Sequence, residues 1–308
     1  METLDPEVEV SVIIVNYNTS SLIIDCLKSI VKETRGISYE VIIVDNASEP
    51  DIESKIRSGV PDLPNVKFCL SSENNGFGVG NNIGMESAKG RKLLFLNPDT
   101  LLINNAIKIL SDFLDNNPRV AASGANLFTR EGSPNFSFKR RLPGVMWEVN
   151  ELLHNIIDKR IFAPDLTFNY GASPIEVGYI TGADLMVKKE IIEEIGGFSP
   201  DFFLYFEETD LCARIKESGG KIFNVPSAKI IHLESQSMAG DNSPINYFKI
   251  DNLEKSHLTY YKRNLNPLSR GLGLWVYRAF LLSRIIATRG KKREEYIYRY
   301  RKFKELNR

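Results

Sequence analysis

The sequence predicts an α/β protein whose core is a mostly parallel sheet covered by helices. Short apolar runs alternate with amphipathic segments of helical period through residues 8–116, and several of these runs end at Asn or Asp. At 308 residues and 43% hydrophobic composition, the chain is long enough to bury a sizeable core. Its 39 basic residues balance 39 acidic residues, which argues against nucleic acid or another polyanion as an obligatory partner.

Each element of the first half follows from its own local pattern. Apolar runs bounded by polar turns predict buried strands. Apolar residues that recur at helical spacing after residue 20 predict a helix with Ser20 or Ser21 as its N-cap. The predicted strands cover 8–15, 41–44, 66–70 and 93–96, and the predicted helices cover 20–33, 82–89 and 104–116.

The alternation loosens after residue 120. Pro, Gly and aromatic residues between 130 and 173 predict a long irregular, lid-like segment, and such segments often hold substrates. Order returns with a strand over 176–188, followed by helices near 190–195 and over 207–218, each stopped by paired glycines. The remaining predicted elements are strands over 221–225 and 229–232 and a separate helical extension from about residue 244.

Cysteine usage and the N-terminus indicate the compartment. Cys26, Cys69 and Cys212 lie far apart in apolar segments, without metal-type spacing or a disulfide framework, so we expect reduced core residues in a cytoplasmic protein. The acidic N-terminus lacks the basic region and apolar stretch of a signal peptide. The late apolar region at 272–287 is interrupted by two arginines and is too short to span a bilayer comfortably.

Two predicted strands finish with an aspartate at the same edge of the sheet. Asp45 follows the run at 41–44, and Asn97-Pro98-Asp99 follows the run at 93–96. Open α/β sheets bind ligands at the carboxyl ends of their strands. One carboxylate is therefore suited to a nucleobase or ribose, and the other to a divalent cation that also binds phosphate oxygens. Ordinary turn chemistry is the alternative for each aspartate taken alone.

The glycine pattern argues against a dinucleotide-binding Rossmann unit. The turn Asn16-Tyr17-Asn18-Thr19 after the first predicted strand contains no glycine-rich phosphate loop. A glycine-rich segment comes later, at 76–80, and it lacks the register of that motif. Neighbouring asparagines predict that this segment is a loop whose backbone approaches a ligand closely, with a flexible turn before a helix as the alternative.

An acidic cluster and one histidine are further candidates. Glu207, Glu208 and Asp210 follow the aromatic stretch at 203–206, where desolvation and like-charge crowding should raise the pKa of at least one carboxyl, as a general base requires. Favourable interaction with the helix dipole is the alternative. His232 ends a predicted strand; a lone His is more often structural, and the acidic metal site makes it a candidate ligand.

The order of these motifs resembles the inverting family-two glycosyltransferases of the GT-A fold, particularly the rhamnosyltransferase-like branch that acts on bacterial surface polysaccharides. That fold is a Rossmann-like nucleotide-binding mixed sheet flanked by helices. The resemblance covers residues 8–237 and is carried by SVIIVNYN at 11–18, VDNAS at 44–48, NGFGVGNN at 75–82, LNPD at 96–99, TGA at 181–183, residues 202–214 and His232. It implies a catalytic domain at 8–238, with a nucleotide half at about 8–125 and an acceptor half at about 126–238, and a C-terminal helical extension at 239–308.

On the donor side, the resemblance implies that a nucleotide-sugar binds at the carboxyl edge of the sheet. Asp99 matches the last aspartate of the family's D-x-D motif and would bind Mg²⁺ or Mn²⁺. The first position is Asn97, a departure usual in this branch, so His232 would be the partner ligand. The base, ribose and nucleotide would be held by Asn16, Tyr17, Asn18, Asp45, Asn75, Gly76 and Asn81.

On the acceptor side, Glu208 falls where the family places its catalytic base. Because that base is more often Asp, Glu207 and Asp210 stay open as alternatives. Thr181, Gly182 and Asp184 would form the floor for the acceptor. The donor expected from the resemblance is dTDP-rhamnose or a UDP-sugar, and the acceptor is a hydroxyl of a glycan or of a lipid-linked saccharide, with no nucleic acid involved.

Other functions and the role of the tail stay open. A sugar-nucleotide nucleotidyltransferase would also use a nucleotide-binding sheet with acidic metal ligands, but it should carry a glycine- and basic-rich loop after the first strand. A non-catalytic nucleotide- or carbohydrate-binding protein is a further alternative. The apolar segment 272–287 and the basic residues after Arg289 fit peripheral contact with the inner membrane, packing on the catalytic domain, or a homodimer contact.

Overall fold

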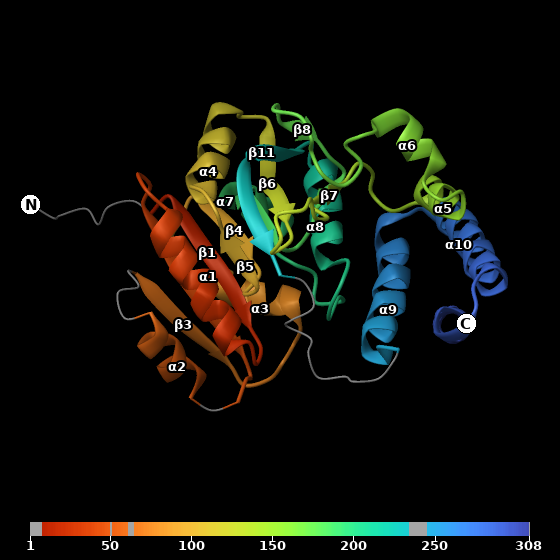
Figure 1. Ribbon diagram of the computed structural model, residues 1–308, viewed down its shortest axis with the longest axis horizontal. Coiled ribbons are helices and arrows are strands. Elements are labelled where there is room, and N and C mark those ends of the chain that lie inside the picture. Colours follow the sequence, from red (N-terminus) through yellow and green to blue (C-terminus); the bar gives the residue numbers. More distant parts are fainter. Residues whose placement is uncertain (1–7, 50, 61–64, 234–244, 308) are drawn as a thin grey trace, which may run out of the picture.

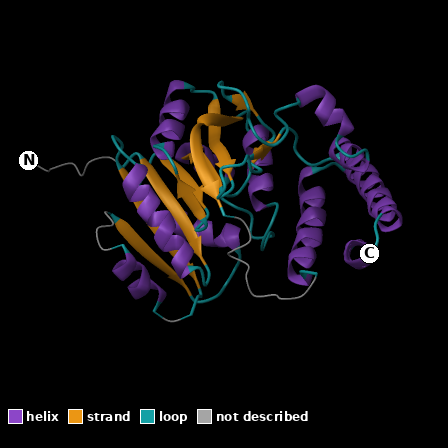
Figure 2. Cartoon of the chain, viewed as in Figure 1, coloured by secondary structure: helices purple, strands orange, loops and turns teal. Residues whose placement is uncertain are grey.

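The computed structural model describes residues 8–49, 51–60, 65–233 and 245–307, and these form the predicted α/β architecture. Nine strands make the central mixed sheet (Figures 1 and 2): β1 (Val10–Asn16), β2 (Tyr39–Asn46), β3 (Val66–Ser71), β4 (Lys92–Leu96), β5 (Thr100–Leu102), β6 (Val120–Phe128), β8 (Ile175–Glu176), β10 (Asp184–Lys188) and β11 (Lys221–His232). Their order is β3-β2-β1-β4-β10-β6-β11-β5, and β8 pairs with β11. Strands β1 to β4 are parallel, whereas β10 runs antiparallel to β4 and β6.

Helices cover both faces of the sheet. On β1, Val12 and Ile14 point to the face packed by α1 (Ser20–Glu33), α2 (Ile52–Gly59) and α4 (Ala106–Asn116). Ile13 and Val15 point to the face packed by α3 (Phe77–Glu86), α7 (Lys189–Ile195) and α8 (Glu207–Glu217). Burial on both faces explains why these strands are continuous apolar runs in the sequence. The polar side chains that could bind a ligand are therefore found at the ends of the strands.

The predicted boundaries of one helix were wrong, because the glycine-rich segment is helical. Helix α3 begins at Phe77, not at residue 82. A Cβ atom on Gly80 would lie 2.8 Å from Val15 Cγ1, and one on Gly84 would lie 2.5 Å from Ile13 Cγ2. These glycines let the helix lie directly on β1, so they serve close helix–strand packing as well as the neighbouring turn.

Other local predictions also needed correction. The strand expected over 176–188 is divided into β8, β9 (Tyr179–Ile180) and β10, and β9 pairs with β7 (Phe138–Lys139) in a separate two-stranded sheet. The two closing strands are one strand, β11, whose register shifts between Val225 and Lys229. Helix α2 and strand β6 were not predicted as elements. Thr19, rather than a serine, is the N-cap of α1, and its hydroxyl donates to Asn16 instead of capping the helix.

The second half of the chain adds a helical unit beside the sheet (Figure 1). It comprises α5 (Val145–Leu152), α6 (Ile156–Phe162), α9 (Tyr247–Asn264), α10 (Pro267–Ala287) and α11 (Gly290–Leu306). The segment predicted as irregular therefore contributes α5, which packs on α10, while α9 packs on α8. Among the described residues, none of the helices combines the length and apolar character needed to cross a membrane. The domain boundary expected at 238–239 lies outside the described residues.

Candidate active site

The turn after β1 is tied to the end of β2 by buried hydrogen bonds. Asn16 is fully buried, and its Nδ2 donates to Asp45 Oδ1 (2.9 Å) and to Ser48 Oγ (3.1 Å). Asp45 Oδ2 accepts from the Ser48 backbone N–H at 3.2 Å. Asn18 has a φ of 55° and its side chain accepts from the Glu49 backbone N–H. Asn16 thus braces the turn from inside, and the exposed side chains of this motif are Tyr17, which is 46% exposed, and Asn18.

The segment after β3 joins the nucleotide half of the sheet to the acidic cluster. Asn46, which sequence reasoning missed as a site residue, donates to Asn74 Oδ1 (2.8 Å) and to the Gly76 carbonyl (3.1 Å). Gly76 has a φ of +88°, and a Cβ there would lie 2.1 Å from the Phe203 carbonyl oxygen. The Phe77 backbone N–H donates to that same oxygen at 3.1 Å. The motif therefore positions residue 203, at the start of the aromatic stretch.

The other predicted asparagines of this motif have different environments. Asn75 is exposed, in agreement with a loop that faces a ligand. Asn81 is fully buried and its Nδ2 donates to the Phe77 carbonyl, so its amide stabilises the first turn of α3. Asn82 exchanges two hydrogen bonds with the Phe198 backbone, both of 2.8 Å. Of this group, only Asn75 presents its side chain to solvent.

Asp99 and His232, predicted from distant parts of the chain, lie side by side. Thr100 pairs with His232 in the β5–β11 ladder, and His232 Nε2 lies 3.4 Å from Asp99 Oδ1 and 3.4 Å from Asn97 Nδ2. Asp99 is 2% exposed, and its Oδ1 has no hydrogen-bond partner within the described part of the chain. An imidazole and a buried carboxylate oxygen without a hydrogen bond fit a divalent cation that takes its other ligands from a diphosphate. The described residues hold no cluster of three or more His, Cys, Asp or Glu that would bind a metal alone.

The three carboxylates near the start of α8 have separate environments. Asp210 is 1% exposed and is fully engaged: Oδ2 accepts from Arg214 Nε (2.9 Å), and Oδ1 accepts from Asn264 Nδ2 (2.9 Å) and Arg263 Nε (3.3 Å). Such a carboxylate holds helices together and is not available as a base. The choice left open by the sequence is thereby narrowed to Glu207 and Glu208.

Glu207 and Glu208 differ in their access to solvent. Burial and the neighbouring charge of Glu208 raise the pKa of Glu207 well above its usual value, and Glu207 Oε2 is buried with no hydrogen-bond partner in the ranges that the structure describes. Burial also raises the pKa of Glu208, against the opposing effect of hydrogen bonds from its own and the Thr209 backbone N–H and from the Thr209 hydroxyl. Glu207 is 4% exposed, whereas Glu208 is partly exposed. Glu208 is therefore the more solvent-accessible of these two carboxyls.

A strained backbone precedes Glu207, and the C-terminal unit supports it. Tyr205 and Phe206 both have positive φ values, 67° and 66°. Ser256 Oγ of α9 donates to the Leu204 carbonyl (2.8 Å), and the His257 ring stacks on Phe206 at a centroid distance of 5.5 Å. Non-glycine residues hold this conformation only when their surroundings fix it. Sequence reasoning missed Ser256 and His257, because no local pattern links them to residues 203–206.

The predicted acceptor residues lie around the turn between β9 and β10. A Cβ on Gly182 would lie 3.7 Å from Glu208 Cβ and 3.6 Å from Phe77 Cε1, and the Asn97 backbone N–H donates to the Ala183 carbonyl (3.0 Å). This turn therefore lies between the Asp99 loop and Glu208. Thr181 Oγ1 is buried without a hydrogen-bond partner among the described residues.

Asp184 occupies a different environment from the one expected. It is fully buried in β10, and its Oδ2 accepts from the Ala125 backbone N–H. Burial raises its pKa to about 7, while that hydrogen bond and the neighbouring His232 oppose the rise. A carboxyl without solvent access does not offer a contact for an acceptor hydroxyl in this conformation. The acceptor role that the resemblance implies for Asp184 therefore stays a prediction, and the described conformation does not support it.

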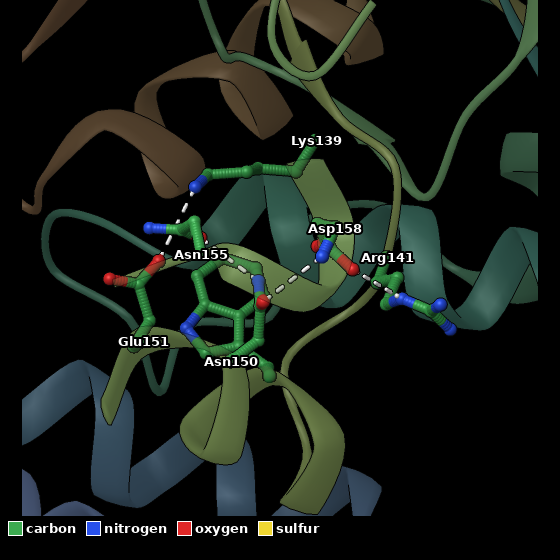
Figure 3. A pocket seen from close by; sticks show the side chains of 7 residues that line it. Lys139, Arg141, Asn150, Glu151, Asn155 and Asp158 are labelled. Carbon is green, nitrogen blue, oxygen red and sulfur yellow. Dashed lines mark hydrogen bonds and ion pairs between the residues drawn. The ribbon is translucent and has the colours of Figure 1, made fainter. Parts of the chain in front are cut away.

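A small cavity lies where β7 meets α5 and α6 (Figure 3). Its side chains pair with one another: Lys139 with Glu151 (3.5 Å), Arg141 with Asp158 (2.9 Å) and Asn150 with Asn155 (2.9 Å). Trp147 completes the lining and stacks on Tyr179 at a centroid distance of 6.0 Å. A volume of about 10 Å³ accommodates one ordered water, so this cavity is a structural junction and not a sugar site.

The glycosyl transferase family 2 model matches residues 11–196, a span that contains the motifs at 44–48, 75–82, 96–99 and 181–183. Among curated proteins, the chain is 24% identical over 298 residues to "dTDP-rhamnosyl transferase RfbF" of Shigella flexneri, covering 92% of this chain and 90% of that protein. It is 26% identical over 217 residues to "N-acetylglucosaminyl-diphospho-decaprenol L-rhamnosyltransferase" of Mycobacterium tuberculosis, covering 65% of this chain and 68% of the relative.

Solved structures share the fold. A mannosyltransferase from Pyrobaculum calidifontis, in complex with GDP-Man and Mn²⁺, superposes with a TM-score of 0.59 at 16% identity, covering 99% of this chain and 88% of that one. GalNAc-T7 with UDP, GalNAc and Mn²⁺ gives a TM-score of 0.60 at 16% identity, covering 98% of this chain and 56% of that one. The predicted fold class, a mixed α/β sheet with C-terminal helices, is confirmed.

Proposed function

This chain belongs to glycosyl transferase family 2 and is a glycosyltransferase, and from that premise we propose how it works. It transfers one sugar from a nucleotide-sugar to an acceptor hydroxyl by a single displacement with inversion. The observation that carries this proposal is the position of the 181–183 turn, which contacts the Asp99 loop on one side and Glu208 on the other. A sugar held at that turn has a leaving-group site and a base on different sides.

The chemistry divides between two sets of residues. Glu208 accepts the proton of the acceptor hydroxyl as the acceptor oxygen forms a bond to the anomeric carbon and the bond to the departing diphosphate breaks. Asp99 and His232 would hold Mg²⁺ or Mn²⁺, which when bound neutralises the charge that develops on that diphosphate. Asp45 and Tyr17 would contact the nucleoside, and Asn75 would close over it. Asn16 acts by bracing Asp45.

The donor and acceptor are proposed from the relatives. The names of two relatives specify rhamnosyl transfer, one from a dTDP donor and one to an N-acetylglucosaminyl-diphospho-decaprenol acceptor. We propose dTDP-rhamnose as the first donor to test and UDP-sugars as the second, with a glycan or lipid-linked acceptor in bacterial surface polysaccharide synthesis. With such an acceptor the enzyme works in the cytoplasm, at the inner face of the membrane.

The decisive experiment separates binding from turnover. Thermal stabilisation and nucleoside diphosphate release are measured with a panel of nucleotide-sugars, with and without Mn²⁺. Asp99→Ala should abolish the metal-dependent part of the stabilisation. Glu208→Gln should retain donor binding and lose at least a hundredfold in transfer rate, the scale of general-base catalysis. Glu207→Gln is the matched control and should transfer at a rate near that of the wild type.

Two results would change the assignment. Transfer at wild-type rate by Glu208→Gln, together with its loss in Glu207→Gln, would make Glu207 the base. Nucleotide binding without turnover for any donor or acceptor tested would contradict the transferase proposal and favour a binding protein.

A further inference from the structure

Helix α10 carries an exposed apolar stripe along its whole length. The stripe recurs at intervals of four and three residues, which keeps it on one side of the helix. Its members Leu268, Leu272, Trp275, Leu282 and Ile286 are 83%, 49%, 67%, 39% and 85% exposed, and the partly exposed Ala279 completes the repeat.

No other element of the described chain covers this stripe. Other residues of α10 face the protein: Tyr277 packs on Phe303 of α11 at a centroid distance of 5.4 Å, and Leu281 is fully buried. A Cβ on Gly273 would lie 2.6 Å from the Tyr261 ring of α9, so that side of α10 is tightly packed. The exposed stripe therefore does not contribute to the packing of α10 against the described elements. Several large apolar side chains on one exposed helix face mark an interaction surface.

The charge along α10 and at the very start of α11 has one sign. Residues 265–293 contain no Asp or Glu and seven basic residues. Arg278, in the middle of α10, is exposed, and so are Arg289 and the three basic residues that begin α11. The seven are Arg270, Arg278, Arg284, Arg289, Lys291, Lys292 and Arg293.

Apolar side chains of the α5–α6 turn lie next to the C-terminal half of α10. Arg284 donates to the Glu151 carbonyl (3.1 Å) and pairs with His154, which holds this turn against α10. Leu153 and Ile156 in the same turn are 43% and 56% exposed. Figure 1 shows α5 and α10 together at the end of the molecule opposite α2 and β3.

We propose that this face of α10 lies on an anionic lipid bilayer, with the helix parallel to the membrane plane. An amphipathic helix with Trp and Leu on one face and basic flanks buries its apolar face at the headgroup boundary, and each basic residue adds attraction to anionic lipid. A second copy of the chain is disfavoured as the occupant, because pairing two such faces would bring cations against cations with no acidic residue within 265–293. The inference deepens the proposed function, since it gives the site access to lipid-linked acceptors.

The test is co-sedimentation of the full chain with vesicles of phosphatidylcholine alone or mixed with phosphatidylglycerol. We expect binding to the mixed vesicles only, and a loss of at least tenfold in partition for the double variant Leu272→Ser/Trp275→Ser. Leu70→Ser is the matched control, because Leu70 is 67% exposed on β3, and it should bind as the wild type does. Arg278→Glu should weaken binding at least fivefold, and Lys55→Glu on α2 should not.

Fluorescence gives a second readout in the same experiment. Trp275 is one of two tryptophans, so brominated lipid should quench part of the emission of the wild type and none of that of the double variant. Thermal melting of each variant verifies the fold. Equal vesicle binding by the wild type and the double variant would overturn the proposal. A wild-type dimer that dissociates in the double variant, without vesicle binding, would also overturn it and identify a second copy as the occupant.

The outcome is independent of the transferase assay. Vesicle binding requires neither donor nor metal, and release of nucleoside diphosphate by water or by a soluble acceptor requires no vesicle. Failure of the docking test with normal turnover would refute only the membrane face, whereas docking without turnover would refute only the proposed reaction.

Discussion

Replacing Gly76 by Ala tests whether the turn after β3 positions the aromatic stretch before Glu207. Gly76 has φ +88° and ψ 176°, a conformation that is costly for an L-residue by about 1–3 kcal/mol. The added Cβ would lie 2.1 Å from the Phe203 oxygen, so the two segments must separate by about 1 Å. That separation breaks the hydrogen bond from the Phe77 N–H to Phe203, worth about 1 kcal/mol. Gly76→Ala should thus lower the free energy of unfolding by about 2–4 kcal/mol.

The same displacement should reduce the transfer rate. A misplacement of about 1 Å near the reacting groups costs about a hundredfold in rate. Urea unfolding measures the stability, and nucleoside diphosphate release at a temperature where the variant is folded measures the rate. The expected signature is a rate loss that persists after correction for the folded fraction.

Gly219→Ala is the matched control. Gly219 also has a φ of +88°, but a Cβ there would meet no atom within 4 Å. It should cost about 1–2 kcal/mol in stability and leave the rate near that of the wild type. Equal stability and equal rates for Gly76→Ala and Gly219→Ala would refute the argument that Gly76 positions residue 203.

Three further outcomes follow from the buried carboxyls. Because Asp184 has a pKa of about 7 in the folded protein, above its ordinary 3.8, its contribution to stability is present at low pH and lost as pH rises to 7, by about 4 kcal/mol. Asp184→Asn should flatten that dependence in urea unfolding measured in EDTA; an unchanged slope would contradict it. Asp210→Ala should lower the free energy of unfolding by about 3 kcal/mol, because it leaves Arg214 without its carboxylate partner. Asp112→Ala, which removes an exposed i,i+4 ion pair, should lower it by less than about 0.5 kcal/mol. With a raised pKa, Glu208 must lose its proton to act, so the transfer rate should rise with pH through that pKa in rapid-mix assays; a rate that falls over this range would exclude Glu208 as the base.

The sequence located the four parallel strands of the first half and named the candidate polar groups at their ends, because both are local properties. Strands β1, β2 and β4 are buried on both faces and are therefore continuous apolar runs that end at polar residues. Parallel strands bring those ends to one edge, so Asp45 and Asp99 were predicted on the same side. His232 became a candidate ligand through the predicted acidic metal site and the resemblance, whereas its position beside Asp99 is set by the pairing of β5 with β11.

Tertiary contacts decided which polar groups are available. Asp210 and Glu208 are two residues apart in the chain. Asp210 accepts hydrogen bonds from α9 side chains 53 and 54 residues away, whereas Glu208 remains partly exposed to solvent. The buried Asn16 side chain donates a hydrogen bond to Asp45, 29 positions away in the chain. The C-terminal unit, expected as a separate extension, supports Phe206 through His257.

The sequence by itself determined the α/β class, the order of the motifs and the identity of the candidate groups, because residue type and period are written along the chain. Only the tertiary structure determined that Asp210 is engaged by distant side chains while Glu208 is partly exposed, that Asp184 is interior, and that the described residues leave one face of α10 exposed. Those properties depend on which distant side chains arrive as hydrogen-bond and packing partners, and the period of a segment reports its burial without naming its partner.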